Sequence, residues 1–405
     1  MCSGGRQSHY FCPMPRIKKR YLFFFVVLLF AALYFANGSP FRSEVDYYVD
    51  RLLFRATERS IFQHNNELPE TQRAAWEAAY WAARNHPLDA EVPHRESFII
   101  GDSARNSAMG LRLHLPLGRE LNVSVSYAGQ TPIFGELYAI RSDGRLPGEH
   151  VRPLTHWRNG QHAFAYEAWE TEGEELILVV QGTPGAAARA EVFVQSSPVL
   201  AFPVAGKDED CIQSFWGAPR DGGRRRHEGN DLFAPKGTPL VAAVSGEVTR
   251  VNNGGIGGKT VWLYDDERDL RYYYAHLDEQ FVRKGQYVER GEAIGTVGNT
   301  GNARTTPPHL HFGVYAKGKA IDPYPFLARP TGNGPAPDNR FSIHPADQPI
   351  STPRRGSHYL RKRAARDGEV IRKLEANENV WLTGVIGRFY RVRTERGERG
   401  FVNFD

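Results

Sequence analysis

Four histidines and one aspartate that could carry out chemistry lie within 85 residues in the second half of the chain. His309 and His311 flank one leucine in a stretch typical of a β-strand, where side chains two residues apart share a face, so both imidazoles can reach one site. His227 and Asp231 lie four residues apart and can supply a second edge from a turn. Two imidazoles and one carboxylate form a three-ligand zinc set that leaves a fourth position for water, as in catalytic zinc sites.

The sequence around these residues resembles the catalytic domain of the lysostaphin- and LytM-type zinc endopeptidases, peptidase family M23, between Asp208 and Leu327. Order, spacing and intervening turns all agree. The matching segments are His227-x-Gly229-x-Asp231, the hairpin GGIGGKTVWLY, Tyr274-Ala275-His276-Leu277, VRKGQYVERGEAIGTVGNTG, Pro308-His309-Leu310-His311-Phe312 and the closing IDPYPFL.

This resemblance implies a role for each of the five residues. In the family, the histidine and aspartate of H-x-G-x-D and the second histidine of H-x-H hold the zinc, which here are His227, Asp231 and His311. The remaining two, His276 and His309, act on the substrate side. They are expected to orient or deprotonate the attacking water and to donate hydrogen bonds to the developing oxyanion. Residue spacing alone does not say which histidine of H-x-H, His309 or His311, is the metal ligand and which is catalytic.

The family's substrates are peptide cross-bridges and stems of peptidoglycan. The resemblance therefore implies a zinc-dependent endopeptidase that hydrolyses peptide bonds in peptidoglycan stems or cross-links by metal-activated water. An alternative is a catalytically silent or autoinhibited M23-like scaffold that regulates other cell-wall hydrolases, with a regulatory protein partner. The presence of all five side chains favours the enzyme.

The amino terminus indicates export. Basic residues between 16 and 20 stand directly before a charge-free apolar run at 21–36, which predicts a transmembrane anchor with its amino end in the cytoplasm. A small-x-small motif at 36–38 is an acceptable cleavage site, so a cleaved signal peptide is the alternative to an anchor. We expect a cell-envelope protein that is anchored in the inner membrane with its bulk periplasmic or extracellular, or secreted if the signal is cleaved.

Hydrophobic periodicity predicts a mainly β chain of several domains. Residues 45–56 and 76–83 show helical spacing, residues 97–204 alternate as in an antiparallel β-sandwich, and the end of the chain resembles a bacterial SH3-like barrel. The predicted parts are a basic leader (1–20), the membrane segment (21–36), two juxtamembrane helices (41–87), a β-sandwich accessory domain (97–204), the M23-type antiparallel β-sheet catalytic domain (205–327), a Pro-rich linker (328–354) and the SH3-like domain (355–405).

Charge and cysteine content exclude two further classes. The chain has a net charge of +5, but its basic excess lies at the two ends and no nucleic-acid-reading motif accompanies it, so nucleic acid is not an expected partner. Cys211 is the single cysteine after the membrane segment, which excludes a disulfide framework within one chain.

We interpret Trp381 as a core residue, and we expect Tyr272, Tyr273 and Tyr274 to alternate between the core and a substrate groove.

Overall fold

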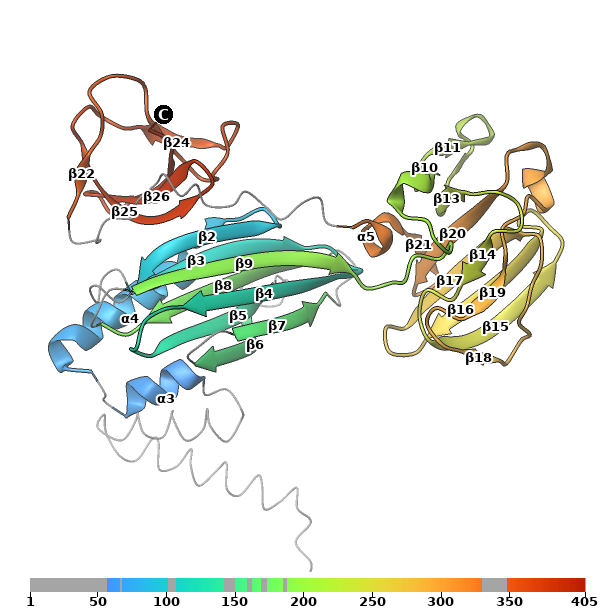
Figure 1. The fold of residues 1–405 in the computed structure, drawn as a ribbon, viewed down its shortest axis with the longest axis horizontal. Coiled ribbons are helices and arrows are strands. Elements are labelled where there is room, and N and C mark those ends of the chain that lie inside the picture. Colours follow the sequence, from blue (N-terminus) through green and yellow to red (C-terminus); the bar gives the residue numbers. More distant parts are fainter. Residues whose placement is uncertain are drawn as a thin grey trace, which may run out of the picture. The chain divides into compact units, whose positions relative to one another are not determined.

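The computed structural model describes residues 57–65, 68–100, 107–141, 150–158, 162–168, 173–184, 188–329 and 348–404 (Figure 1). The chain forms two compact units, Met1–Leu68 and Pro69–Asp405. The predicted leader, the membrane segment and the predicted helix at 45–56 lie outside the described residues. Within the described ranges, no helix is both long enough and apolar enough to cross a bilayer.

Three α-helices are present in the described ranges: α3 (Glu58–His64), α4 (Glu70–Asn85) and α5 (Tyr324–Leu327). In α4, the residues with helical spacing are buried, from Trp76 to Ala83, which confirms that predicted helix. The Trp76 indole donates a hydrogen bond to the Gly182 carbonyl over 2.8 Å, and this contact joins the helix to the neighbouring sheet. The helix ends before Pro87, which has no amide hydrogen to continue it.

The segment after α4 folds into two sheets whose inner faces share one hydrophobic core. One sheet has the strand order β1-β3-β8-β5-β6. The other sheet contains the neighbouring strands β2, β9, β4 and β7, in that order. Buried leucines and valines from both sheets fill the space between them, as in a β-sandwich. The strands are β1 (Leu88–Asp89), β2 (His94–Ile100), β3 (Ala108–Leu115), β4 (Arg119–Tyr127), β5 (Ile133–Arg141), β6 (His150–Arg158), β7 (His162–Glu167), β8 (Glu174–Gly182) and β9 (Ala188–Pro198).

An eight-stranded sheet carries the predicted site residues, in the order β10-β13-β20-β17-β16-β15-β18 with β21 beside β20. One face of this sheet packs into a core that includes Leu310 and Phe312, both fully buried. The strands and 3-10 turns are η2 (Glu209–Cys211), β10 (Ile212–Ser214), β11 (Pro219–Arg220), η3 (Asp221–Gly223), β12 (Arg225–Arg226), β13 (Asn230–Phe233), β14 (Pro239–Val241), β15 (Gly246–Asn253), β16 (Lys259–Asp265), β17 (Leu270–Leu277), β18 (Tyr287–Val288), β19 (Ala293–Thr296), η4 (Gly301–Thr305), β20 (His309–Ala316) and β21 (Lys319–Ile321).

The three consecutive tyrosines of β17 alternate between the faces of this sheet. Tyr272 and Tyr274 are fully buried in the core, and the Tyr274 hydroxyl accepts a hydrogen bond from the Ala243 amide. Tyr273 points to the opposite face, where it is half-buried. The predicted alternation is therefore confirmed.

The last strands of the chain pack around their own core and continue the second sheet through the pairing of β25 with β2. Its strands are β22 (Ile350–Ser351), β23 (Tyr359–Arg361), β24 (Val370–Lys373), β25 (Asn379–Ile386), β26 (Phe389–Thr394) and β27 (Arg399–Val402). Phe401 is fully buried, whereas Trp381 is half-buried, with the Arg393 guanidinium carbon 4.7 Å from the centre of its ring. The interpretation of Trp381 as a core residue is wrong, because the core-facing positions of β25 are Val380 and Leu382.

Strand β22 falls inside the range predicted as linker, 328–354. Ile350 and Ser351 pair with β25, and Thr352 is buried with its hydroxyl bonded to the Glu375 carbonyl. The linker pattern was rich in proline and polar residues, and such composition does not reveal a two-residue strand that forms by pairing with a distant partner.

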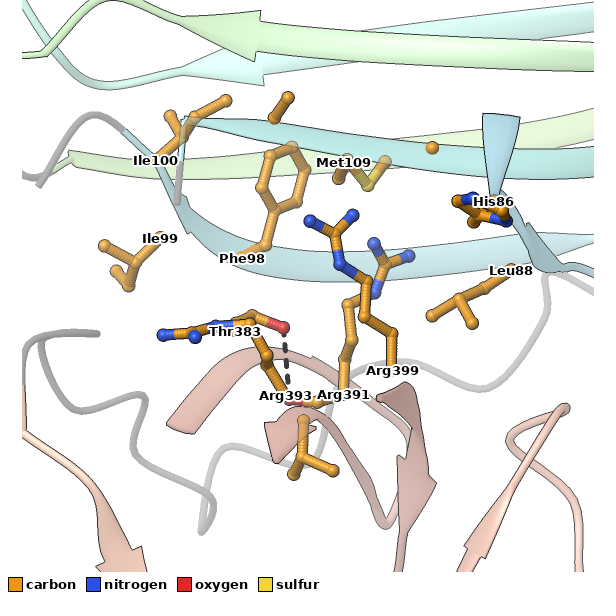
Figure 2. A pocket seen from close by; sticks show the side chains of 13 residues that line it. His86, Leu88, Phe98, Ile99, Ile100, Met109, Thr383, Arg391, Arg393 and Arg399 are labelled. Atoms are coloured by element: carbon orange, nitrogen blue, oxygen red, sulfur yellow. Dashed lines mark hydrogen bonds between the residues drawn. The ribbon is translucent and has the colours of Figure 1, made fainter. Parts of the chain in front are cut away.

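A small pocket lies where β2 and β3 meet β25, β26 and β27 (Figure 2). Phe98 and Met109 line one side, and three arginines, Arg391, Arg393 and Arg399, line the other. Its volume of about 40 Å³ can hold water but not a peptide, and none of the predicted site residues lines it. This small pocket is therefore separate from the predicted site.

Replacing Leu310 by alanine should destabilise the fold, because Leu310 is the fully buried residue between the two histidines of β20. We expect a loss of about 2–5 kcal/mol in the free energy of unfolding, measured by urea denaturation. Ile256→Ala is the matched control, since Ile256 is 66% exposed and its loss should change stability by less than about 0.5 kcal/mol. Equal unfolding midpoints for the two variants would contradict this placement of the core.

Candidate metal centre

Three of the predicted residues meet at the pairing of β13 with β20. Asp231 lies opposite His311 in the antiparallel register, and His227 reaches the same point from the turn before β13. The Nε2 atom of His227 lies 2.9 Å from Asp231 Oδ1 and 2.9 Å from His311 Nδ1, and the latter two atoms are 3.0 Å apart. These atoms form the one group of three or more metal-ligand side chains found within the described residues.

Backbone and side-chain partners fix which atoms face this triangle. His227 Nδ1 lies 2.9 Å from the Phe215 carbonyl, which can only accept, so this nitrogen carries the proton and Nε2 presents a lone pair. The second oxygen of Asp231, Oδ2, accepts a hydrogen bond from Arg220 Nη2 over 2.9 Å. The Arg220 guanidinium is itself anchored on the Ser214 hydroxyl at 2.6 Å. Asp231 Oδ1 is therefore the oxygen left for the imidazoles.

The triangle has more acceptors than protons. His227 Nε2 and Asp231 Oδ1 both offer lone pairs, and His311 Nδ1 can donate at most one hydrogen. Burial alone would raise the pKa of the Asp231 carboxyl, but its close contacts with the His227 and His311 imidazoles hold it far below its usual range, so the carboxylate is charged. A charged carboxylate and two imidazole nitrogens within 3.0 Å of one another fit zinc, which prefers this donor set.

The other two predicted histidines lie beside the triangle. The ring centres of His276 and His309 are 5.1 Å apart, and those of His276 and His311 are 6.0 Å apart. His276 and His309 are both buried, with exposures of 7% and 6%. All five residues singled out in the sequence are thus brought together at one site.

Each of these two imidazoles is oriented by a backbone carbonyl. His276 Nδ1 donates to the Thr300 carbonyl over 2.9 Å, and His309 Nδ1 donates to the Pro307 carbonyl over 2.8 Å. The His309 ring also stacks on Phe233 at 5.0 Å. In both rings Nε2 is left as the acceptor. Burial, followed by repulsion from His309 and His311, lowers the pKa of His276 to about 4, so His276 is neutral near pH 7.

His276 has a backbone conformation that residues other than glycine rarely adopt. Its φ is 67°, in the left-handed region, and its amide donates to the Gly257 carbonyl over 2.8 Å. The supporting loop requires glycine at 258, where φ is 65° and an added Cβ would lie 2.3 Å from the Thr300 hydroxyl oxygen. Strain of this kind persists only where surrounding contacts impose it, and it is common at functional sites.

Sequence reasoning missed Arg220 and the left-handed backbone of His276. Arg220 ends the short strand β11 and has four further arginine or aspartate residues nearby, and nothing in the spacing marks it as the partner of Asp231. Outside the site, His114 is exposed, and its Nδ1 lies 2.7 Å from Glu175 Oε1. Cys211 is a buried free cysteine.

Comparison with known proteins places this geometry in a family. The model of peptidase family M23 matches residues 225–323. The catalytic domain of lysostaphin from Staphylococcus simulans is 35% identical, and the match covers 28% of this chain and 88% of that structure, with a TM-score of 0.25. Residues 225–323 form a peptidase family M23 domain.

Two curated relatives show how far the likeness extends. The L-Ala--D-Glu endopeptidase of Bacillus subtilis is 37% identical over 139 residues, which cover 31% of this chain and 42% of the relative. The peptidoglycan DD-endopeptidase ShyC of Vibrio cholerae is 36% identical over 100 residues, covering 25% and 22%. The chain thus spans less than half the length of these two relatives.

The zinc content of variants should distinguish the metal ligands from the neighbouring histidines. We expect the purified protein to hold about one zinc ion per chain, His311→Ala to lose it, and His276→Ala to keep it, because His276 lies beside the triangle and not in it. Metal content is measured by mass spectrometry after gel filtration. Full zinc content in His311→Ala, or none in His276→Ala, would overturn this division.

Proposed function

We propose that the protein is a zinc-dependent endopeptidase of the cell envelope that hydrolyses peptide bonds in peptidoglycan stems or cross-links. The observation that supports it most is the convergence of His227, Asp231 and His311 on one point with His276 and His309 beside it. In this proposal the first three residues hold the zinc and the last two are catalytic.

Bound zinc would supply Lewis acidity for a scissile carbonyl and would lower the pKa of an attacking water. The chain's own residues do the rest. His276 is neutral near pH 7 and offers Nε2 as a proton acceptor, because its Nδ1 hydrogen is committed to Thr300. His309 offers Nε2 in the same way, since Pro307 holds its Nδ1 hydrogen. Once protonated, either imidazole can donate to the developing oxyanion or to the leaving amine.

Fixed orientation is the contribution of the fold to this chemistry. A general acid or base must lie within hydrogen-bond reach of its proton, and each catalytic imidazole is held by one carbonyl and by ring contacts. Positioning a proton acceptor in this way contributes about 10²–10⁴-fold in rate. Loss of a metal ligand should therefore be more severe than loss of either catalytic imidazole.

Peptidoglycan is the proposed substrate because relatives of this domain act there. ShyC is named a peptidoglycan DD-endopeptidase, and the Bacillus subtilis relative is named an L-Ala–D-Glu endopeptidase. The predicted export segment at 21–36 would place the domain on the side of the membrane where peptidoglycan lies. The predicted SH3-like domain has an excess of basic residues, and we propose that it binds peptidoglycan or an anionic wall polymer.

The alternative of a silent or autoinhibited scaffold has less support. All five side chains needed for turnover are present and oriented. In the described part of the chain, contacts from the β-sandwich reach the peptidase segment at the β16–β17 turn, through Arg268 and Glu167, and at α5, through Arg119 and Pro325. None of these four residues belongs to the site.

Digestion of purified cell-wall sacculi by the zinc-loaded protein tests the proposed function. We expect release of peptide fragments that end at one defined bond, identified by mass spectrometry. His276→Ala should slow release about 10²–10⁴-fold, and His311→Ala should abolish it. His114→Asn, at an exposed histidine on the β-sandwich, is the matched control and should cleave at the wild-type rate. Release by His311→Ala equal to wild type would refute the proposal.

A further inference from the structure

Three arginines share one face of the last strands of the chain. Arg391 and Arg393 lie two residues apart on β26, and Arg399 of β27 is the partner of Arg393 in the antiparallel register. Residues two apart on a strand, and residues directly opposite on neighbouring strands, point to the same side. Val392, between the first two, is buried in the core of these strands. The three arginines therefore lie on the face away from that core.

This face lines the small pocket beside β2 and β3. Figure 2 shows Phe98 and Met109 across the pocket from the arginine side chains. Among the residues that the structure describes, no aspartate or glutamate lines the pocket, and His86 is the one other titratable group in its wall. The charges of the wall are therefore those of the three guanidinium groups.

A buried carboxylate just outside the wall balances one of these charges. Arg391 Nη2 donates to Glu96 Oε2 over 2.7 Å, and Arg391 Nε lies 2.6 Å from Glu96 Oε1. Burial would raise the pKa of Glu96, but Arg391 and His94 hold it below its usual value, so Glu96 is charged. Glu96 is fully buried and also contacts His94 Nε2 at 3.0 Å. The Nη1 group of Arg391 is left for a different acceptor.

Arg399 has no comparable carboxylate in the described part of the chain. Its side chain forms no hydrogen bond or ion pair there, and the residue directly opposite it, Arg393, carries the same charge. Like charges at opposite positions of neighbouring strands destabilise a sheet. The adjacent carboxylate of Glu398 is paired with Arg372, with Oε2 2.6 Å from Nη2. Burial, followed by repulsion from Arg391 and Arg393, lowers the pKa of Arg399.

Partly buried positive charges that outnumber the carboxylates beside them favour an anion. Removing a charge from water is costly unless an opposite charge compensates for it. Guanidinium groups present several N–H donors in a planar fork that matches the oxygens of phosphate, sulfate and carboxylate groups. The pocket volume of about 40 Å³ limits the ligand to a few atoms. A small oxyanion fits both the charge and the size.

We infer that the pocket formed by Arg391, Arg393 and Arg399 with Phe98 and Met109, the arginine pocket, binds one free oxyanion of the size of sulfate or phosphate. The anion offsets the repulsion among the arginines and stabilises the packing of the last strands where β25 pairs with β2. No residue of the pocket belongs to the metal centre, so this site goes beyond the proposed function and does not depend on it.

Calorimetric titration of the purified full chain with sodium sulfate tests this inference. We expect one sulfate per chain, and the thermal unfolding midpoint should rise with sulfate concentration, because a ligand that binds the folded state stabilises it. Sodium chloride at the same ionic strength is the control for general salt effects. Glycerol phosphate, which carries the same kind of group on a larger molecule, should bind at least about 10-fold more weakly, since the pocket admits only a few atoms.

Variants make the test specific to the arginine pocket. Arg399→Gln should weaken sulfate binding at least about 10-fold, through loss of charged hydrogen bonds, and Arg399→Lys should recover part of the affinity. Without sulfate, the unfolding midpoint of Arg399→Gln should be no lower than that of the wild type, because the repulsion from Arg393 is gone. Arg388→Gln, at an exposed arginine between β25 and β26, is the matched control and should bind sulfate as the wild type does.

A further variant separates this site from the metal centre. His311→Ala should bind sulfate with wild-type affinity, since His311 lies outside the pocket. Sulfate binding that disappears in His311→Ala would place the anion at the metal and overturn the arginine pocket. No saturable binding, equal affinity of Arg399→Gln and wild type, an equal rise in midpoint with sodium chloride, or equally tight binding of glycerol phosphate would also overturn it. Digestion of sacculi tests the proposed endopeptidase separately.

Discussion

The site depends on the pairing of β13 with β20, which sets Asp231 directly opposite His311. Side chains on a strand alternate between faces, so a slip of one residue would send His311 into the core and Leu310 toward the site. Burial of Leu310, Phe312 and Val314 on the other face makes such a slip costly. The hydrophobic face of β20 thereby holds the metal-binding face in register.

Backbone carbonyls determine which nitrogen each imidazole presents. Phe215, Thr300 and Pro307 accept the Nδ1 hydrogens of three of the four site histidines, and so the opposite nitrogens are left as acceptors. His311 is the exception, because its Nδ1 faces the triangle directly. These carbonyls come from loops, so the chemistry depends on loop geometry as much as on the sheet that supports it.

The histidine and aspartate positions could be predicted because their spacing follows strand geometry and matches the family pattern. The alternation of the β17 tyrosines and the helix around Trp76 followed from the same local periodicity. Trp381 could not be placed, since a strand in a small sheet has two faces and aromatic character does not say which is buried. Arg220 and the left-handed His276 depend on how distant loops pack, which no local pattern encodes.

The central claim is that one zinc ion binds between His227, Asp231 and His311. Anomalous diffraction at the zinc edge from crystals of the zinc-loaded protein tests it most directly. The account predicts a single strong peak within about 2.0–2.2 Å of His227 Nε2, Asp231 Oδ1 and His311 Nδ1. A peak bound instead by His276 and His309, or by Cys211, would contradict it.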